Sequence, residues 1–122
     1  MTFNEWKEKY EARCEEYVLL PGFECYFEPE RGFMCWGIEQ HGEDKYFIID
    51  HTCTNDMDAY HKIAHDLAVK HGCKYMTTQT IRSPKAYVRK SGGAHLDLKL
   101  SGFRPNGKWY WVFVKETAND KI

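Results

Sequence analysis

The stretch that decides the fold is Tyr46-Phe-Ile-Ile-Asp-His-Thr-Cys53, together with the segment that follows it at residues 55–71. The stretch is apolar and rich in β-branched residues, which is typical of a buried strand. The following segment repeats apolar residues at helical spacing: Met57, Tyr60, Ile63, Ala64, Leu67 and Ala68. A strand that runs directly into a helix directs the free N–H groups of the helix at whatever lies beyond the strand end. The junction is therefore a natural place for a phosphate-bearing ligand.

Length and composition predict one folded domain. The chain has 122 residues, of which 43% are hydrophobic, enough for a single core. We expect residues 1–115 to form this domain and residues 116–122 to form a polar tail. No apolar run approaches the roughly 18 residues of a membrane span. The first residues are polar and acidic rather than the apolar core of a signal peptide, so we expect a cytoplasmic protein.

The five cysteines, at positions 14, 25, 35, 53 and 73, are widely spaced and contain no Cys-x-x-Cys pair. Zinc sites and disulfide frameworks need paired spacing. We therefore predict reduced cysteines that are mostly buried.

Basic residues are concentrated in the C-terminal part. Residues 74–122 contain ten Lys or Arg and three Asp or Glu, whereas the chain as a whole has a net charge of −1. This segment either faces an anionic partner or carries solvated lysines. Trp109, Tyr110 and Trp111 either stack nucleic-acid bases, pack in the core, or bind a protein partner. The acidic N-terminal half and the lack of a recognised motif disfavour nucleic acid.

The N-terminal half predicts one helix and three strands. Thr2 and Glu5 form a capping-box pattern that starts a helix over residues 2–20, which Pro21-Gly22 ends. Strands are predicted at 23–27, 33–38 and 45–53, joined by short turns into an antiparallel meander. Thr54 or Asn55 can cap the following helix, and Gly72 can end it.

The C-terminal half predicts a strand at 74–82, a short helix at 83–91 that Ser83-Pro84 opens, and a final hairpin. In this hairpin Leu96, Leu98 and Leu100 alternate with polar residues, Asn106-Gly107 makes the turn, and residues 108–114 return. The fold class is therefore α+β, with a mixed, mostly antiparallel sheet, a central strand–helix–strand crossover and about three helices.

This order of elements resembles the GNAT superfamily of N-acetyltransferases, with the first strand missing. The resemblance covers about residues 2–115. It includes the Gly32-Phe-Met-Cys-Trp-Gly37 strand, the Phe47-Ile-Ile-Asp50 strand that leads into a helix, and the Ser83-Pro-Lys-Ala86 helix that ends in Gly92-Gly93. Small GNAT-like proteins of this size are common in bacteriophages, including some internal virion proteins. The resemblance therefore implies a location in the host cytoplasm or in the virion.

The resemblance implies a site for acetyl-CoA. The pantetheine arm of acetyl-CoA would lie along residues 45–53, and Thr52, Thr54 and Asn55 would contact the cofactor. Asp50 is the candidate general base for an amine, since a carboxylate near a strand end can accept a proton. Tyr87 is the candidate acid for the departing thiolate.

One departure from the family pattern decides the predicted function. The family loop carries glycines and a basic residue that hold the pyrophosphate, whereas this chain has Thr54-Asn-Asp-Met-Asp58. Two carboxylates near phosphates repel them. We therefore expect a catalytically degenerate domain that binds another protein or has a structural role. The alternatives are an active acetyl-CoA-dependent N-acetyltransferase and a nucleic-acid-binding module.

Three further groups are weighed as sites. His51 can act as a base or be an ordinary polar residue beside Asp50. His61 and His65 have a spacing that can bind a metal, but the expected third ligand is missing, so no metal is predicted. Cys53 is either an activated thiol or, as we favour, a packing residue.

Overall fold

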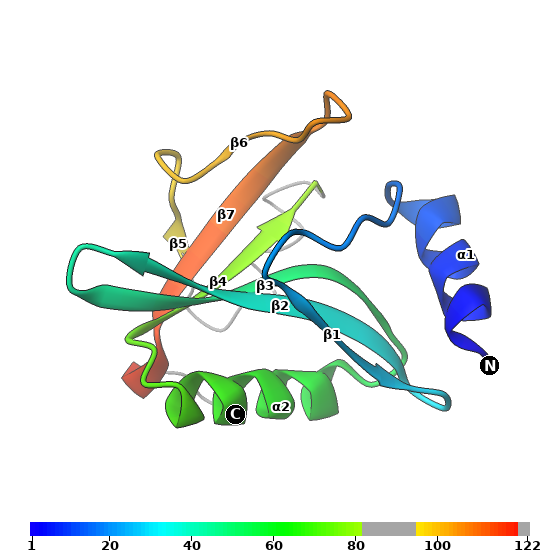
Figure 1. The fold of residues 1–122 in the computed structure, drawn as a ribbon, viewed down its shortest axis with the longest axis horizontal. Coiled ribbons are helices and arrows are strands. Elements are labelled where there is room, and N and C mark those ends of the chain that lie inside the picture. Colours follow the sequence, from blue (N-terminus) through cyan, green and yellow to red (C-terminus); the bar gives the residue numbers. More distant parts are fainter. Residues whose placement is uncertain (82–94, 120–122) are drawn as a thin grey trace.

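The computed structural model describes residues 1–81 and 95–119 (Figure 1). It contains two α-helices in this part of the chain, and a short 3₁₀ helix, η1, at Thr117–Asn119. The helices are α1 (Phe3–Arg13) and α2 (Met57–Lys70). The strands are β1 (Glu24–Glu28), β2 (Gly32–His41), β3 (Asp44–Thr54), β4 (Tyr75–Thr80), β5 (His95–Leu96), β6 (Gly102–Phe103) and β7 (Trp109–Glu116). None of the described helices is long and apolar enough to cross a membrane.

The strands form a mixed sheet in the order β1-β2-β3-β4-β7-β5, and β6 pairs separately with β7. Only β3 and β4 run parallel among these pairs, and α2 provides the crossover between them. The predicted α+β class, meander and crossover are therefore confirmed. A parallel pair needs such a long connection because its strands start at the same end of the sheet.

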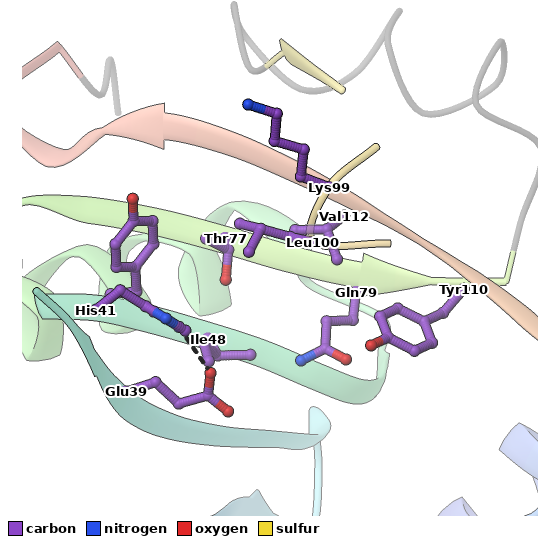
Figure 2. Close-up of a pocket in the computed structure, with 10 residues that line it drawn as sticks. Glu39, His41, Ile48, Thr77, Gln79, Lys99, Leu100, Tyr110 and Val112 are labelled. Atoms are coloured by element: carbon purple, nitrogen blue, oxygen red, sulfur yellow. Dashed lines mark hydrogen bonds and ion pairs between the residues drawn. The ribbon is translucent and has the colours of Figure 1, made fainter. Parts of the chain in front are cut away.

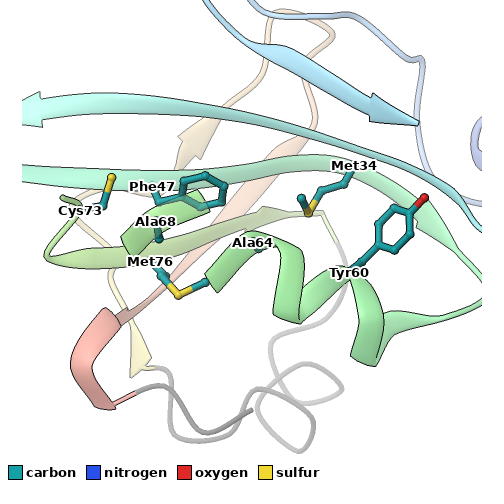
Figure 3. Close-up of a cluster of buried hydrophobic side chains, with 7 residues drawn as sticks. All are labelled: Met34, Phe47, Tyr60, Ala64, Ala68, Cys73 and Met76. Carbon is teal, nitrogen blue, oxygen red and sulfur yellow. The ribbon is translucent and has the colours of Figure 1, made fainter. Parts of the chain in front are cut away.

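The two helices cover opposite faces of the sheet. Side chains alternate along β2, so Met34 lies on the face that α2 covers while Phe33 and Cys35 lie on the face that α1 covers. This double burial explains why β2 begins with four consecutive buried residues. On the α2 face the core is apolar (Figure 3), with seven buried residues: Met34, Phe47, Tyr60, Ala64, Ala68, Cys73 and Met76.

On the α1 face most of the buried side chains are aromatic. Trp6, Tyr10, Phe33 and Cys35 are buried in one cluster. Phe33 makes edge-to-face contacts with the rings of Phe3, Tyr10 and Tyr17 at centroid distances between 5.4 and 5.7 Å. Such pairs contribute about 0.5–1.5 kcal/mol each beyond the area they bury.

A β-bulge interrupts β3 at the position that matters most for function. Met34 pairs with Thr52, and Trp36 pairs with Ile49, so Asp50 and His51 together lie opposite one residue of β2. A bulge inserts one extra residue and redirects side chains locally. Regular alternation would direct Asp50 and His51 to opposite faces. In the structure both contact groups on the α1 side of the sheet.

The parallel pair β3–β4 ends just before this bulge. Its last paired residues are Ile49 and Thr78, although β3 continues to Thr54 and β4 to Thr80. Figure 1 shows the two strands diverging beyond this point. The sheet therefore opens where the bulged residues lie.

The first predicted helix is too long. The capping box of Thr2 and Glu5 is confirmed, with both reciprocal hydrogen bonds present, but α1 ends at Arg13 and not at residue 20. Glu15 leaves the helical path and is buried against Arg104, while the Glu11 carboxylate accepts a hydrogen bond from the N–H of Tyr17 at 2.8 Å. Tertiary contacts override helix propensity here.

The predicted continuous strand before the final turn is also wrong. Residues between β5 and β6 form a turn, because the Asp97 carboxylate accepts hydrogen bonds from the N–H groups of Lys99 and Leu100. Asp competes with strand pairing in this way. The turn at Asn106-Gly107 is confirmed, with Gly107 at φ +85°. The predicted helix at 83–91 lies outside the described residues.

Gly32 makes the close approach that joins β2 to the end of β3. It has φ +120°, and a Cβ built on it would lie 2.0 Å from the carbonyl oxygen of Cys53. Gly42 also has a positive φ, +63°, but a Cβ there would meet nothing within 4 Å. A side chain at Gly42 would cause backbone strain alone, whereas a side chain at Gly32 would cause backbone strain and a steric clash.

We predict that Gly32→Ala lowers the free energy of unfolding by well over the roughly 1–2 kcal/mol expected for Gly42→Ala from positive φ alone. Urea unfolding followed by circular dichroism measures both variants. Equal losses in the two variants would contradict the close approach of β2 to β3.

Candidate functional site

A buried ionic cluster fills the opening of the sheet on the α1 side. Arg104, from the turn between β6 and β7, donates from Nε to Glu15 Oε2 at 3.0 Å and from Nη2 to Asp50 Oδ1 at 2.5 Å. Its Nε also forms an ion pair with Glu15 Oε1 at 2.9 Å. Glu15 and Asp50 are 3% and 4% exposed, so neither carboxylate meets bulk water. Asn106 adds a hydrogen bond from Nδ2 to Glu15 Oε1 at 3.2 Å. One guanidinium thus compensates two buried negative charges.

His51 extends the cluster toward α1. Its Nδ1 lies 2.5 Å from the hydroxyl of Tyr10, and its Nε2 lies 3.8 Å from Asp50 Oδ2. Burial lowers the pKa of His51, against the raising effect of Asp50, and burial also raises the pKa of Tyr10. A neutral imidazole therefore accepts a hydrogen bond from a Tyr10 hydroxyl that keeps its proton.

The structure places the candidate base Asp50 inside this cluster. Oδ1 is held by Arg104, and Oδ2 is buried without a hydrogen-bond partner. A carboxylate that accepts a proton from an incoming amine needs an open path and a free lone pair. Here the burial of Asp50 closes the path, and the ion pair with Arg104 occupies one oxygen. Asp50 therefore has a structural role. The candidate acid Tyr87 lies outside the described residues.

The junction at the start of α2 is closed by the chain itself. Asp56 is the N-cap, so the prediction that Thr54 or Asn55 caps this helix is wrong. Its Oδ1 accepts from the N–H of Ala59 at 3.1 Å, which places a carboxylate where an anion would bind. Arg31, on the turn between β1 and β2, lies 3.8 Å from the other oxygen of Asp56.

The three candidate cofactor residues make internal hydrogen bonds. Thr52 donates to the carbonyl of Asp50 at 2.9 Å, and Thr54 donates to the carbonyl of Arg31 at 2.7 Å. Asn55 donates from its side chain to the carbonyl of Glu30 at 3.0 Å. The turn between β1 and β2 is thereby attached to the junction.

The remaining candidates lie apart from the cluster. His61 and His65 lie one turn apart on α2, and no group of three potential ligands for a metal occurs among the described residues. Cys53 packs against the aromatic cluster on the α1 face, as its prediction as a packing residue requires. All five cysteines carry free thiols, and Cys35 and Cys73 are buried while the other three are partly buried.

The aromatic run on β7 is divided between two faces of the sheet. Trp109 and Trp111 contact each other at a centroid distance of 5.8 Å, whereas Tyr110 lies under the guanidinium of Arg104 at 5.3 Å. The three rings therefore do not form one continuous stacking surface.

A pocket of about 250 Å³ opens on the face of the sheet away from α2 (Figure 2), and one of its lining residues, Tyr110, also contacts Arg104. Its floor is formed by neighbouring strands, with Ile48 from β3, Thr77 and Gln79 from β4, and Tyr110 from β7. His41 and Glu39 form an exposed pair 3.0 Å apart at its edge. This mixed lining offers hydrogen-bond donors and acceptors but no buried charge dedicated to a ligand.

Sequence reasoning missed Glu15, Arg104 and Tyr10 as members of the central cluster. Glu15 falls within the predicted helix over residues 2–20, and Arg104 is one of ten basic residues in the C-terminal part. The sequence offered one signal, because Arg104 precedes the Pro105-Asn-Gly107 turn and such a turn holds its flanking residues in fixed positions.

No known protein-family model matches this chain, and no curated protein is significantly similar to it.

We predict that Arg104→Met lowers the free energy of unfolding by about 3–5 kcal/mol, because it leaves two buried carboxylates without a countercharge. Urea unfolding measures the loss. Arg31→Met is the matched control, since Arg31 is 40% exposed and its surface ion pairs contribute at most about 1 kcal/mol. Equal losses of unfolding free energy in the two variants would contradict the buried ion pairs of Arg104.

We further predict that stability falls as the pH drops below about 6.5, the ordinary pKa of histidine. The native pKa of His51 is lower than this value, so in this window the unfolded chain binds a proton that the folded chain does not. Unfolding free energies at pH 7.5 and pH 5.5 test it. His51→Gln should reduce the difference between the two values, and an unchanged difference would show that His51 is not the group responsible.

Proposed function

We propose that this protein is a GNAT-like domain that has lost efficient catalysis and acts as a binding or structural module. The observation that carries this proposal is the start of α2. Asp56 occupies the N-cap, and Arg31 approaches it at 3.8 Å. The positive end of the helix is therefore already compensated by a carboxylate of the chain. A pyrophosphate at this place would have to displace it or accept like-charge repulsion.

The order of elements supports the GNAT-like part of the proposal. An antiparallel meander leads through α2 into a parallel strand, and the last hairpin completes the sheet beside it. Asp50 supports the loss of catalysis, because its ion pair with Arg104 and its burial remove it from the role of an open base. The resemblance to small phage proteins makes the virion or the host cytoplasm the proposed location.

An exposed phenylalanine that packs against a half-buried tryptophan supports the binding role. Phe103, on β6, is 71% exposed and contacts the ring of Trp109 edge to face at 4.9 Å. Aromatic side chains, phenylalanine included, are enriched at the cores of protein interfaces. A protein is therefore the proposed partner, in preference to nucleic acid.

Calorimetric titration with acetyl-CoA tests the proposal. We expect no heat of binding at millimolar acetyl-CoA, because the Asp56 carboxylate already binds the N–H of Ala59 at the helix start and the Thr54 hydroxyl already donates to Arg31. A micromolar dissociation constant would overturn the degenerate reading and favour an acetyl-CoA-dependent N-acetyltransferase. Asp56→Ser is the matched variant, since it keeps a capping oxygen and removes the charge. Weak binding by this variant alone would identify the carboxylate as the group that excludes the cofactor.

A further inference from the structure

Two cysteines face each other across the first hairpin. Cys25 on β1 and Cys35 on β2 are direct partners in the antiparallel register. Both pack against the aromatic cluster on the α1 face, so their side chains point to the same side of the sheet. The sequence separates them by ten positions, and the hairpin brings them together.

This placement satisfies the geometry of a disulfide. Directly opposed residues in an antiparallel pair have Cα atoms about 4.5–5.5 Å apart. Disulfides accept Cα separations of about 4.4–6.8 Å. A bond between the sulfur atoms therefore needs side-chain rotation but no rearrangement of the strands.

The two thiols differ in exposure and in chemistry. Cys35 is 1% exposed and hydrogen-bonds through Sγ to the Tyr17 hydroxyl at 3.5 Å. Cys25 is only partly buried. The hydrogen bonds from Cys35 and Tyr17 lower the pKa of Cys25 to about 7, against the effect of burial, while the pKa of Cys35 is raised. Cys25 is thus the accessible thiolate near neutral pH, and Cys35 is the buried thiol beside it.

We propose that Cys25 and Cys35 form an oxidation site for hydroperoxides, in which Cys25 is the attacking thiolate and Cys35 resolves the product into a reversible cross-strand disulfide. In the first step the Cys25 thiolate attacks the terminal peroxide oxygen, the O–O bond breaks, and Cys25 becomes a sulfenic acid while the other oxygen leaves as hydroxide or, from an organic hydroperoxide, as alkoxide. In the second step Cys35 attacks the Cys25 sulfur, the S–O bond breaks, and the Cys35 proton leaves with that oxygen as water. Two electrons pass from the thiol pair to the peroxide.

The arrangement explains why the site is selective and reversible. Cys73 is buried on the opposite face of the sheet, in the α2 core, so it has no access to this chemistry. Cys14 and Cys53 pack against the same aromatic cluster but are not register partners of Cys25. Disulfides that are exposed or strained by strand geometry are reduced more readily than structural ones. Excess dithiol reductant should therefore restore both thiols.

Stoichiometric hydrogen peroxide, added to the folded protein at neutral pH, tests this proposal. We expect the intact mass to fall by two hydrogens and peptide mapping to link Cys25 to Cys35. Cys35→Ser should stop at the sulfenic acid, which dimedone traps on Cys25, and Cys25→Ser should abolish the reaction. Cys73→Ser is the control and should behave as wild type.

A second measurement does not depend on the variants folding. The rate of iodoacetamide labelling at Cys25 in the wild-type protein should rise with a midpoint near pH 7. A disulfide between any other pair of cysteines, or a disulfide that joins two protein molecules, would overturn the proposal. So would a Cys25 labelling midpoint at the ordinary thiol pKa of about 8.5.

Discussion

The contact on which the rest of the structure depends is the double ion pair of Arg104. It joins three segments far apart in the chain, since Arg104 and Glu15 are 89 residues apart and Arg104 and Asp50 are 54 apart. Two buried carboxylates without this guanidinium would each cost several kcal/mol. Each member of this contact comes from an irregular part of the chain. Glu15 follows the early end of α1, Asp50 lies in the bulge of β3, and Arg104 lies in the turn between β6 and β7. These local departures from regular structure are therefore explained by a single electrostatic requirement.

The need to compensate buried charges also explains why the site offers neither an open general base nor an open anion site. A carboxylate fixed by an arginine is a structural group, and a carboxylate that caps its own helix occupies one N–H group and places a negative charge where a phosphate would bind. Asp50 and Asp56 stand at the two positions where the predicted acetyl-CoA site would need an open base and an open anion site. Both carboxylates are instead used internally. Asp50 and Asp56 could either stabilise the fold or contact a ligand, and in this structure both stabilise the fold.

Patterns that depend on near neighbours were predictable from the sequence. The strands around residues 46–53, the amphipathic helix α2, the capping box of Thr2 and the Asn106-Gly107 turn all follow from spacing and local chemistry. The end of α1, the bulge and the split between β5 and β6 were missed. The first two depend on partners that are tens of residues away, and the third on a side-chain hydrogen bond of Asp97 that competes with strand pairing. The sequence therefore singled out Asp50, but it did not identify Arg104 and Glu15, with which Asp50 forms the buried ionic cluster.

The two chemically distinctive features of the α1 face share one side chain. The ring of Tyr17 lies 5.7 Å from the imidazole of His51, and its hydroxyl contacts the sulfur of Cys35. Tyr17 is held in this position because α1 ends at Arg13 and the Glu11 carboxylate binds its backbone N–H. Formation of a disulfide removes the Cys35 thiol from the Tyr17 hydroxyl, so oxidation of the hairpin changes the contacts beside the ionic cluster. The early end of α1 therefore has two effects. It lets Glu15 reach Arg104, and it places Tyr17 between the ionic cluster and Cys35.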